Sequence, residues 1–306
     1  MKKNSFLGIS EEGFHTVAYT EWGSAEPGLP TVICVHGYSR NGRDFDALAS
    51  YLSMTGRHVY CPDVVGRGDS SWFKKAQHYT FTQYSTDMTT LIARTQAHQI
   101  DWIGTSMGGI IGMMLAALPN SPIRRLILND VGAQIPLHGL KKLAKCVSKT
   151  LDFPSLQAAQ DYFKLSHSEF GPLTDAQWET LTQNSVEQRG NNLFRVKIDP
   201  AIKNPKSTTQ FVSDFLHHPH RALEGLFYDI DLWYLWQQIR CPVLIIHGAH
   251  SELLTTPIIN KMRKIHDQTE LMVIEDAGHA PALLDRRQHE LITHWLDSTL
   301  PNKRNI

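Results

Sequence analysis

A short glycine-containing segment constrains the fold of this chain more than any other feature. Residues 104–109 read GTSMGG; they follow the apolar run 100–103 and open the apolar stretch 110–118. A short apolar run is typical of a buried strand, and the longer stretch is typical of a helix. The segment therefore predicts a tight strand–turn–helix unit with Ser106 in the turn, where glycine on either side permits close approach of the backbone. We expect this turn to hold Ser106 in a strained and exposed conformation.

The rest of the sequence extends this unit into a repeated pattern. Further short apolar runs occur at 31–35, 58–61, 125–128, 243–246 and 271–274, with helical patterns at 84–96, 109–118 and 288–296. The runs are continuous rather than alternating, as expected for parallel strands covered on both faces. The succession predicts an α/β fold with an open, mostly parallel sheet and helices on both sides, and an antiparallel hairpin at its edge around residues 14–22.

The pattern is interrupted in the middle of the chain. Between residue 131 and about residue 236 there are helical patterns and no convincing buried strand. The helical patterns lie at 137–151 and 174–189, and Thr174 is a typical helix-capping residue at the start of the second. We therefore predict one core domain and one inserted helical cap, with the core made of residues 1–131 and 237–306 and the cap of residues 132–236.

Composition excludes two classes of protein. The 30 Lys and Arg residues balance the 30 Asp and Glu residues, and no cationic cluster stands out, which argues against nucleic-acid binding. No stretch approaches the roughly 18 uninterrupted apolar residues that a bilayer span requires. The N-terminal residues lack the apolar core of a secretory signal, so we expect a cytoplasmic protein, either a monomer or a homodimer.

Three motifs in these segments resemble those of the α/β-hydrolase superfamily. Residues 104–108 match its G-x-S-x-G motif in the required strand–turn–helix context. His36 and Gly37, at the end of the run 31–35, look like its HG turn, and residues 63–70, DVVGRGDS, look like its D-x-x-G-x-G-x-S loop. The resemblance covers nearly the whole chain outside the predicted cap and implies the α/β-hydrolase fold. We interpret the 63–70 loop as structural, because its glycines suit a turn across the sheet edge.

The resemblance also implies roles for particular residues. Ser106 would be the nucleophile, and the backbone N–H groups of Tyr38 and Met107 would form an oxyanion hole that stabilises the developing negative charge. His279 follows the last apolar run within the segment DAGHAP and resembles the family's catalytic histidine. An imidazole suits this role because its ordinary pKa near 6.5 lets it accept and return a proton at neutral pH.

The acid that orients the histidine has two candidates. The family usually carries it after the strand that here includes 243–246, where Glu252 stands in place of the more common Asp. Glutamate is one methylene longer than aspartate and can still orient the imidazole, so Glu252 is our first choice. Asp130 is the alternative, since some members place the acid after the strand that here includes 125–128.

These residues predict a serine hydrolase that cleaves a small or medium hydrophobic ester, thioester or lactone through an acyl-enzyme, with no cofactor and no metal. The candidate substrate-binding residues are His36, Gly37, Trp233 and Trp236, although the tryptophans would equally suit packing of the cap on the core. The histidine cluster at 217–220 is interpreted as a solvated loop rather than a metal site.

Two other functions remain open. One is carbon–carbon bond hydrolysis of the meta-cleavage type, in which Arg189 or Arg195 could grip a substrate carboxylate. The other is a ligand-binding receptor or regulatory protein that keeps the fold and a slow catalytic triad. A serine at the turn argues against the dehalogenase and epoxide hydrolase relatives, which use aspartate there.

Overall fold

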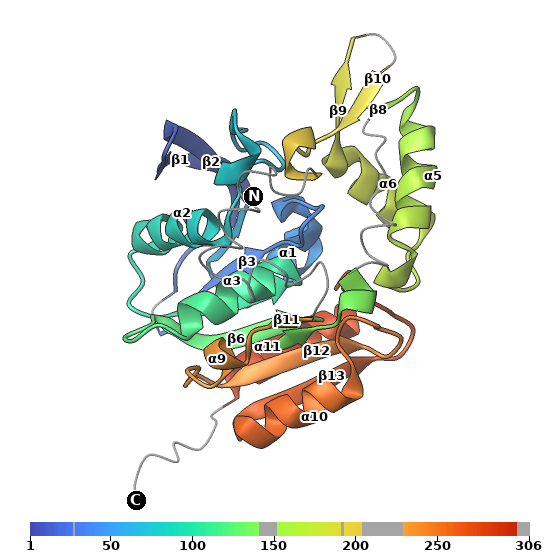
Figure 1. The fold of residues 1–306 in the computed structure, drawn as a ribbon. Coiled ribbons are helices and arrows are strands. Elements are labelled where there is room, and N and C mark those ends of the chain that lie inside the picture. The colour runs from blue at the N-terminus through green and yellow to red at the C-terminus, as the bar shows by residue number, and fades with distance from the viewer. Residues whose placement is uncertain (27, 141–151, 191–192, 204–228, 299–306) are drawn as a thin grey trace, which may run out of the picture.

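The computed structural model describes residues 1–26, 28–140, 152–190, 193–203 and 229–298. Its centre is an eight-stranded sheet with the order β1-β2-β4-β3-β5-β6-β12-β13 (Figure 1). The strands are β1 (Lys2–Ser10), β2 (Gly13–Trp22), β3 (Thr31–Val35), β4 (Val59–Pro62), β5 (Ile100–Thr105), β6 (Ile123–Asn129), β12 (Val243–Gly248) and β13 (Thr269–Ile274). The first two pairings, β1 with β2 and β2 with β4, are antiparallel, and all the others are parallel. The predicted mostly parallel sheet is confirmed. The edge does carry an antiparallel hairpin, but it spans β1 and β2, and the residues predicted to form it, 14–22, supply only its second strand.

Helices cover both faces of this sheet. They are α1 (Asp46–Met54), α2 (Phe81–Thr95), α3 (Met107–Ala116), α9 (Trp233–Trp236), α10 (Thr256–Ile265) and α11 (Arg286–Asp297). Apolar residues of α1 and α11 share one buried cluster with Val32 and Ile103, whereas α2, α3, α9 and α10 share another with Ile33 and Trp102. Neighbouring residues of β3 and β5 thus contribute to opposite faces, as alternation along a strand requires.

The residues between β6 and β12 are here called the insertion, and its described residues between 152 and 203 build a separate layer beside the sheet (Figure 1). Its described elements are β7 (Gln134–Ile135), β8 (Asp152–Phe153), α5 (Leu156–Ser166), η3 (Ser168–Phe170), α6 (Asp175–Ser185), β9 (Val186–Arg189), β10 (Leu193–Val196), η4 (Pro200–Lys203), β11 (Ile230–Asp231) and α9. A small apolar cluster that includes Phe163, Trp178 and Val196 holds α5, α6 and β10 together. The insertion therefore has a hydrophobic core of its own.

The insertion was predicted to be helical with no buried strand, and its described part contains short, poorly buried strands as well as helices. The order β8-β10-β9 forms a three-stranded antiparallel sheet, and the pattern predicted as helical at 174–189 divides into α6 and β9. These strands are short and half-exposed, so they lack the continuous apolar runs that identify the central strands. Thr174 does cap α6, in a reciprocal arrangement with Gln177. Most of the pattern at 137–151 lies outside the described residues.

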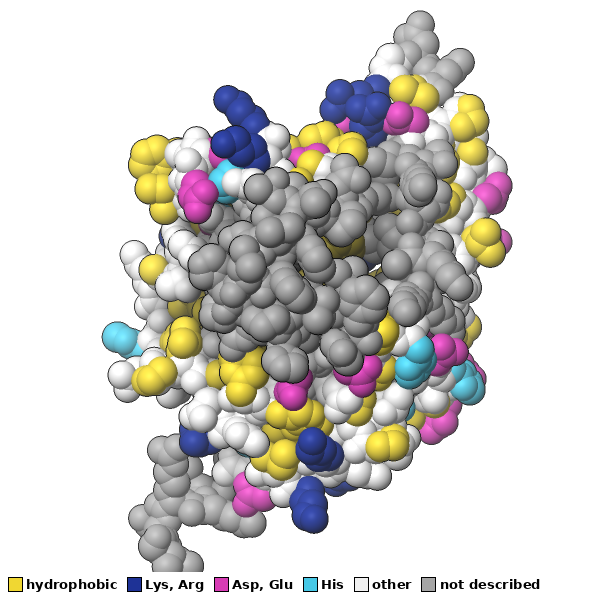
Figure 2. Space-filling model, in the orientation of Figure 1, with side chains coloured by type: hydrophobic (Ala, Val, Ile, Leu, Met, Phe, Trp, Pro, Cys, Tyr) yellow, Lys and Arg dark blue, Asp and Glu magenta, His cyan; other side chains and the backbone are white. Residues whose placement is uncertain are grey.

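The described surface carries its charges in small groups. On the face in Figure 2, the coloured Lys and Arg side chains lie in several separate places and do not form one continuous basic surface. Among the described helices, none combines the length and the apolar character that crossing a membrane would require.

Candidate active site

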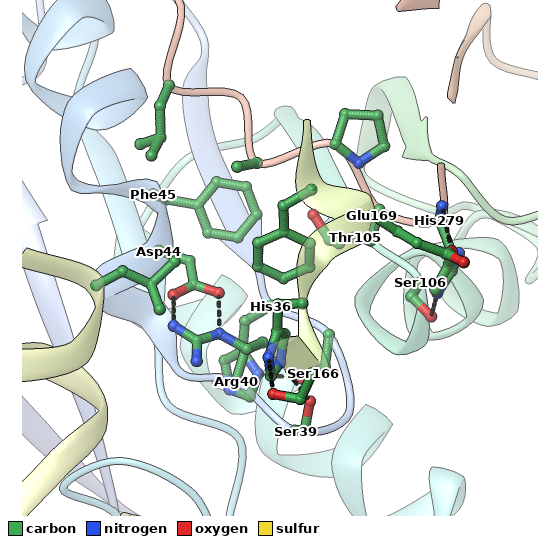
Figure 3. Close-up of a pocket in the computed structure, with 18 of the residues that line it drawn as sticks. His36, Ser39, Arg40, Asp44, Phe45, Thr105, Ser106, Ser166, Glu169 and His279 are labelled. Carbon is green, nitrogen blue, oxygen red and sulfur yellow. Dashed lines mark hydrogen bonds and ion pairs between the residues drawn. The ribbon is translucent and has the colours of Figure 1, made fainter. Parts of the chain in front are cut away.

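The carboxyl ends of five parallel strands bring the predicted site residues to one edge of the sheet. His36 follows β3, Ser106 follows β5, Asp130 follows β6, and the loops after β12 and β13 carry Glu252 and His279. Loops at the carboxyl ends of the strands are where open α/β sheets bind ligands. A pocket of about 480 Å³ lies here, lined by residues of this edge and of the insertion, including Ser106, His279 and Glu252 (Figure 3).

The turn at Ser106 has the strained geometry that its sequence predicts. Ser106 directly precedes α3 and has φ 48° and ψ −109°, a backbone conformation that residues other than glycine rarely adopt. A Cβ on Gly104 would collide with the carbonyl oxygen of Gly108, and one on Gly108 would collide with that of Val35. Glycine is therefore required at both positions, and the tight turn presents the Ser106 side chain to the pocket.

His279 lies within hydrogen-bonding distance of Ser106 on one side and of Asp130 on the other. Its Nε2 is 3.1 Å from the Ser106 hydroxyl oxygen, and its Nδ1 is 2.8 Å from Asp130 Oδ2. Because a carboxylate only accepts hydrogen bonds, Nδ1 carries the proton and donates to Asp130. Nε2 is then the acceptor of the Ser106 hydroxyl proton, which is the tautomer that a general base needs.

The carboxylate that accepts from His279 Nδ1 belongs to Asp130, the alternative from sequence, and not to Glu252, the first choice. The single Nδ1–H of His279 is directed at Asp130, and Glu252 lines the pocket wall instead. The loop after β12 does supply a residue to the arrangement, but it is Ser251, whose hydroxyl donates to Asp130 Oδ2 at 2.6 Å. The same hydroxyl accepts hydrogen bonds from the backbone N–H groups of Leu253 and Leu254, which sets the course of the chain through this loop.

The surroundings of Asp130 keep its carboxylate charged. The side chain is fully buried, and burial acts to raise its pKa. Hydrogen bonds from His247, His279 and Ser251, together with positive charge on His279, outweigh burial and lower the pKa below its ordinary value. The backbone N–H of Gly248 also donates to Oδ1, at 3.0 Å. Asp130 therefore remains an anion over a wide pH range and can stabilise an imidazolium on His279.

The HG turn and the 63–70 loop are tied together by buried hydrogen bonds. His36 Nδ1 donates to the Gly37 carbonyl at 2.7 Å, and its Nε2 accepts from the Val64 N–H at 2.9 Å. Burial lowers the pKa of His36 to about 3, so its ring is neutral and can act as that acceptor. His36 and Gly37 both line the pocket, but the ring nitrogens of His36 are occupied by the fold. The Asp63 carboxylate accepts from the Gly42 and Asp69 N–H groups, consistent with a structural loop.

Arg67 joins the two residues predicted to supply the oxyanion-hole N–H groups. Its guanidinium is fully buried; Nε donates to the Tyr38 carbonyl at 3.1 Å, and Nη2 lies 3.6 Å from Met107 Sδ. Met107 is the first residue of α3 and directly follows Ser106, so its N–H has no intrahelical partner. Sequence reasoning missed Arg67, because one arginine in a loop gives no sign that it will be buried.

The structure does not place the candidate aromatic and cationic residues in the pocket. Trp236 is fully buried in the core and donates to the Met262 carbonyl, while Trp233 donates to Gln134 and packs under Lys261. Both tryptophans therefore attach the insertion to the core. The two arginines suggested as carboxylate ligands are also elsewhere: Arg189 pairs with Glu187 and Arg195 with Asp152, both on the small sheet of the insertion.

The sequence also predicts that the histidine cluster at 217–220 is a solvated loop and not a metal site. The histidines at 217–220 lie outside the described residues. Within the described ranges, no group of three or more His, Cys, Asp or Glu side chains has an arrangement that could hold a metal ion.

The carboxyl edge of the parallel sheet carries a serine, a histidine and an aspartate in hydrogen-bonded order, an arrangement that many hydrolases use for acyl transfer. A family model described as alpha/beta hydrolase fold matches residues 30–285. A 3-hydroxybutyrate-oligomer hydrolase from Cupriavidus necator is 37% identical over 286 residues, which is 92% of this chain and 92% of that protein. This chain belongs to the alpha/beta hydrolase family.

Solved structures agree with this assignment. A putative hydrolase from Rickettsia typhi superposes with a TM-score of 0.85 at 32% identity, covering 98% of this chain and 100% of that one. An alpha/beta hydrolase from Novosphingobium aromaticivorans superposes with a TM-score of 0.80 at 26% identity, covering 96% and 98%.

Proposed function

We propose that this chain is a serine hydrolase that cleaves a small or medium carboxylic ester through an acyl-enzyme on Ser106. The observation that carries the proposal is the continuous hydrogen-bonded order Ser106–His279–Asp130 at the wall of a pocket. In this proposal His279 takes the hydroxyl proton as Ser106 attacks the ester carbonyl, and Asp130 stabilises the resulting imidazolium. The N–H groups of Tyr38 and Met107 stabilise the oxyanion, and water then releases the acyl group.

We further propose that the substrates are short hydroxyacyl esters. The relative from Cupriavidus necator is named for 3-hydroxybutyrate oligomers, which are chains of ester-linked hydroxy acids. The pocket volume of about 480 Å³ lies in the usual range for small-molecule sites. Its wall combines apolar side chains such as Phe45 and Leu181 with polar ones such as Ser166 and Asn184, a mixture that suits a chain alternating between methyl-bearing carbon and ester oxygen.

We propose that the insertion acts as a cap over this pocket. Residues of α5, η3 and α6 form part of the pocket wall opposite the sheet edge, so they bound the space available to the acyl group. The carbon–carbon hydrolase alternative has less support, because its suggested carboxylate ligands, Arg189 and Arg195, lie on the small sheet and are paired with Glu187 and Asp152. The other alternative, a receptor or regulatory protein with a slow triad, predicts the same Ser106–His279–Asp130 order and differs from this proposal in a much lower turnover of esters.

The substrate proposal predicts a preference for short esters. The purified chain should hydrolyse p-nitrophenyl butyrate and the linear dimer of 3-hydroxybutyrate, with kcat/KM for p-nitrophenyl palmitate at least about tenfold lower because a long acyl chain exceeds the pocket. Release of p-nitrophenol and chromatography of the free hydroxy acid measure these rates. Turnover of a dienoate vinylogous diketone with no hydrolysis of any ester would instead assign carbon–carbon chemistry.

A further inference from the structure

The insertion makes direct hydrogen bonds to the loop that carries His279. The backbone carbonyl of Glu169, in η3, accepts from the Gly278 N–H at 2.8 Å, and the Phe170 carbonyl accepts from the Ala282 N–H at 3.1 Å. The Glu169 side chain adds a third bond, in which Oε2 accepts the backbone N–H of His279 at 2.9 Å. Figure 3 shows the Glu169 side chain extending to His279, beside Ser106.

The backbone of this loop requires support from its surroundings. Ala280 and Leu283 have φ values of 63° and 54°, in the left-handed region that disfavours non-glycine residues. Each such residue costs about 1–3 kcal/mol and persists only where other contacts hold it. The core holds the later part of the loop, because Asn129 donates to the Pro281 carbonyl and His289 to the Leu283 carbonyl. At His279 itself, the acceptor for the backbone N–H comes from the insertion.

The insertion also contacts the turn predicted to form the oxyanion hole. The Tyr38 hydroxyl donates to the Ile202 carbonyl at 2.7 Å, and the Asn41 side chain donates to the Asn184 carbonyl at 3.1 Å. The insertion therefore contacts both the loop that carries His279 and the turn after β3 that carries Tyr38, and these two loops both lie beside Ser106.

We propose that Glu169 is a positioning residue that fixes the backbone of His279, so that the insertion helps to build the active site as well as to cover it. The inference rests on the proposed function of Ser106 and His279. Glu169 acts through the backbone of His279 and takes no part in the bond changes. Its hydrogen bond sets the distance and angle from the imidazole to the Ser106 hydroxyl. Small errors in this placement reduce the rate of proton transfer much more than they reduce substrate binding.

Substitutions of Glu169 test this role through the separation of kcat from KM. Glu169→Ala should lower kcat for p-nitrophenyl butyrate about 10- to 100-fold and leave KM within about threefold, since the lost bond orients His279 rather than the substrate. Glu169→Gln should retain at least about a third of the wild-type kcat, because its amide oxygen can accept the same N–H. Glu169→Asp, one methylene shorter, should fall between them and carries the test if the alanine variant does not fold.

Two controls make the result specific. Glu187→Ala removes another carboxylate of the insertion, one that pairs with Arg189 on the small sheet, and should leave kcat unchanged. Titration of the reactive serine with a fluorophosphonate corrects every kcat for the folded fraction. A change confined to KM, an unchanged kcat in Glu169→Ala, or equal losses in the alanine and glutamine variants would overturn the proposal. Absence of fluorophosphonate labelling in the wild type would instead refute the proposed function.

Discussion

Ser106→Ala should lower kcat for ester hydrolysis by about 10⁴-fold or more while the chain stays folded. The variant keeps His279 and Asp130 but has no hydroxyl to attack the carbonyl, and triad enzymes lose most of their rate when the nucleophile is removed. Stability should change little, because the side chain makes one hydrogen bond, to His279, worth about 1 kcal/mol. Initial rates with p-nitrophenyl butyrate and the midpoint of thermal unfolding measure the two effects.

A second serine of the same pocket provides the matched control. Ser168 lines the pocket but is given no part in the reaction, so Ser168→Ala should keep kcat within about threefold of wild type. If Ser106→Ala folds normally and turns over esters at the wild-type rate, Ser106 is not the nucleophile.

The second large effect on kcat is expected from replacing Asp130, the proposed acid of the triad. Asp130→Asn should lower kcat about 10³- to 10⁴-fold near neutral pH, whereas Glu252→Gln should change it by less than about threefold. An asparagine can turn its NH₂ group toward His279 Nδ1, which would leave the ring proton on Nε2 and remove the acceptor that Ser106 needs. Glutamine at 252 leaves the Nδ1–Asp130 hydrogen bond intact.

Stability measurements separate this effect from misfolding. In Asp130→Asn with its NH₂ in the place of Oδ2, the amide oxygen in the place of Oδ1 can still accept from the Gly248 N–H. The Ser251 hydroxyl still accepts from the Leu253 and Leu254 N–H groups, so circular dichroism should show a folded protein. A larger loss in Glu252→Gln than in Asp130→Asn would return the acid role to Glu252.

The turn that carries Ser106 could be predicted because its main sequence signal lies in one short segment. Ser106 lies between two glycines, and the requirement at Gly104 comes from Gly108 of the same turn. The requirement at Gly108 comes from Val35 at the end of the neighbouring strand β3. The parallel strands were predictable for a similar reason, since continuous apolar runs reflect burial on both faces.

The acid could not be chosen from the sequence because two loops satisfied the same rule. Asp130 and Glu252 follow β6 and β12, which are adjacent parallel strands, so both loops leave the same edge of the sheet near His279. The deciding feature is the course of the loop after β12, where Ser251 rather than Glu252 turns toward the Asp130 carboxylate. That course depends on contacts among distant residues.

The insertion was predicted least well, again for a physical reason. Its strands pair over only a few residues and bury little on either face, so their sequences resemble loops. The tryptophan Trp236, near the end of the insertion, is buried as its size suggests. It packs into the core of the sheet domain and not into the pocket, and the sequence did not distinguish these two places. Glu169 reaches His279 across 110 residues of chain, a contact for which the sequence offers no signal.

The central claim is that Ser106 is an activated nucleophile, and covalent labelling tests it most directly. The native chain treated with a fluorophosphonate and digested should yield, by mass spectrometry, one phosphonylated peptide with the modification on Ser106, formed much more slowly in Asp130→Asn. Modification of a different serine, or a folded chain in which Ser106 stays unlabelled, would contradict the account.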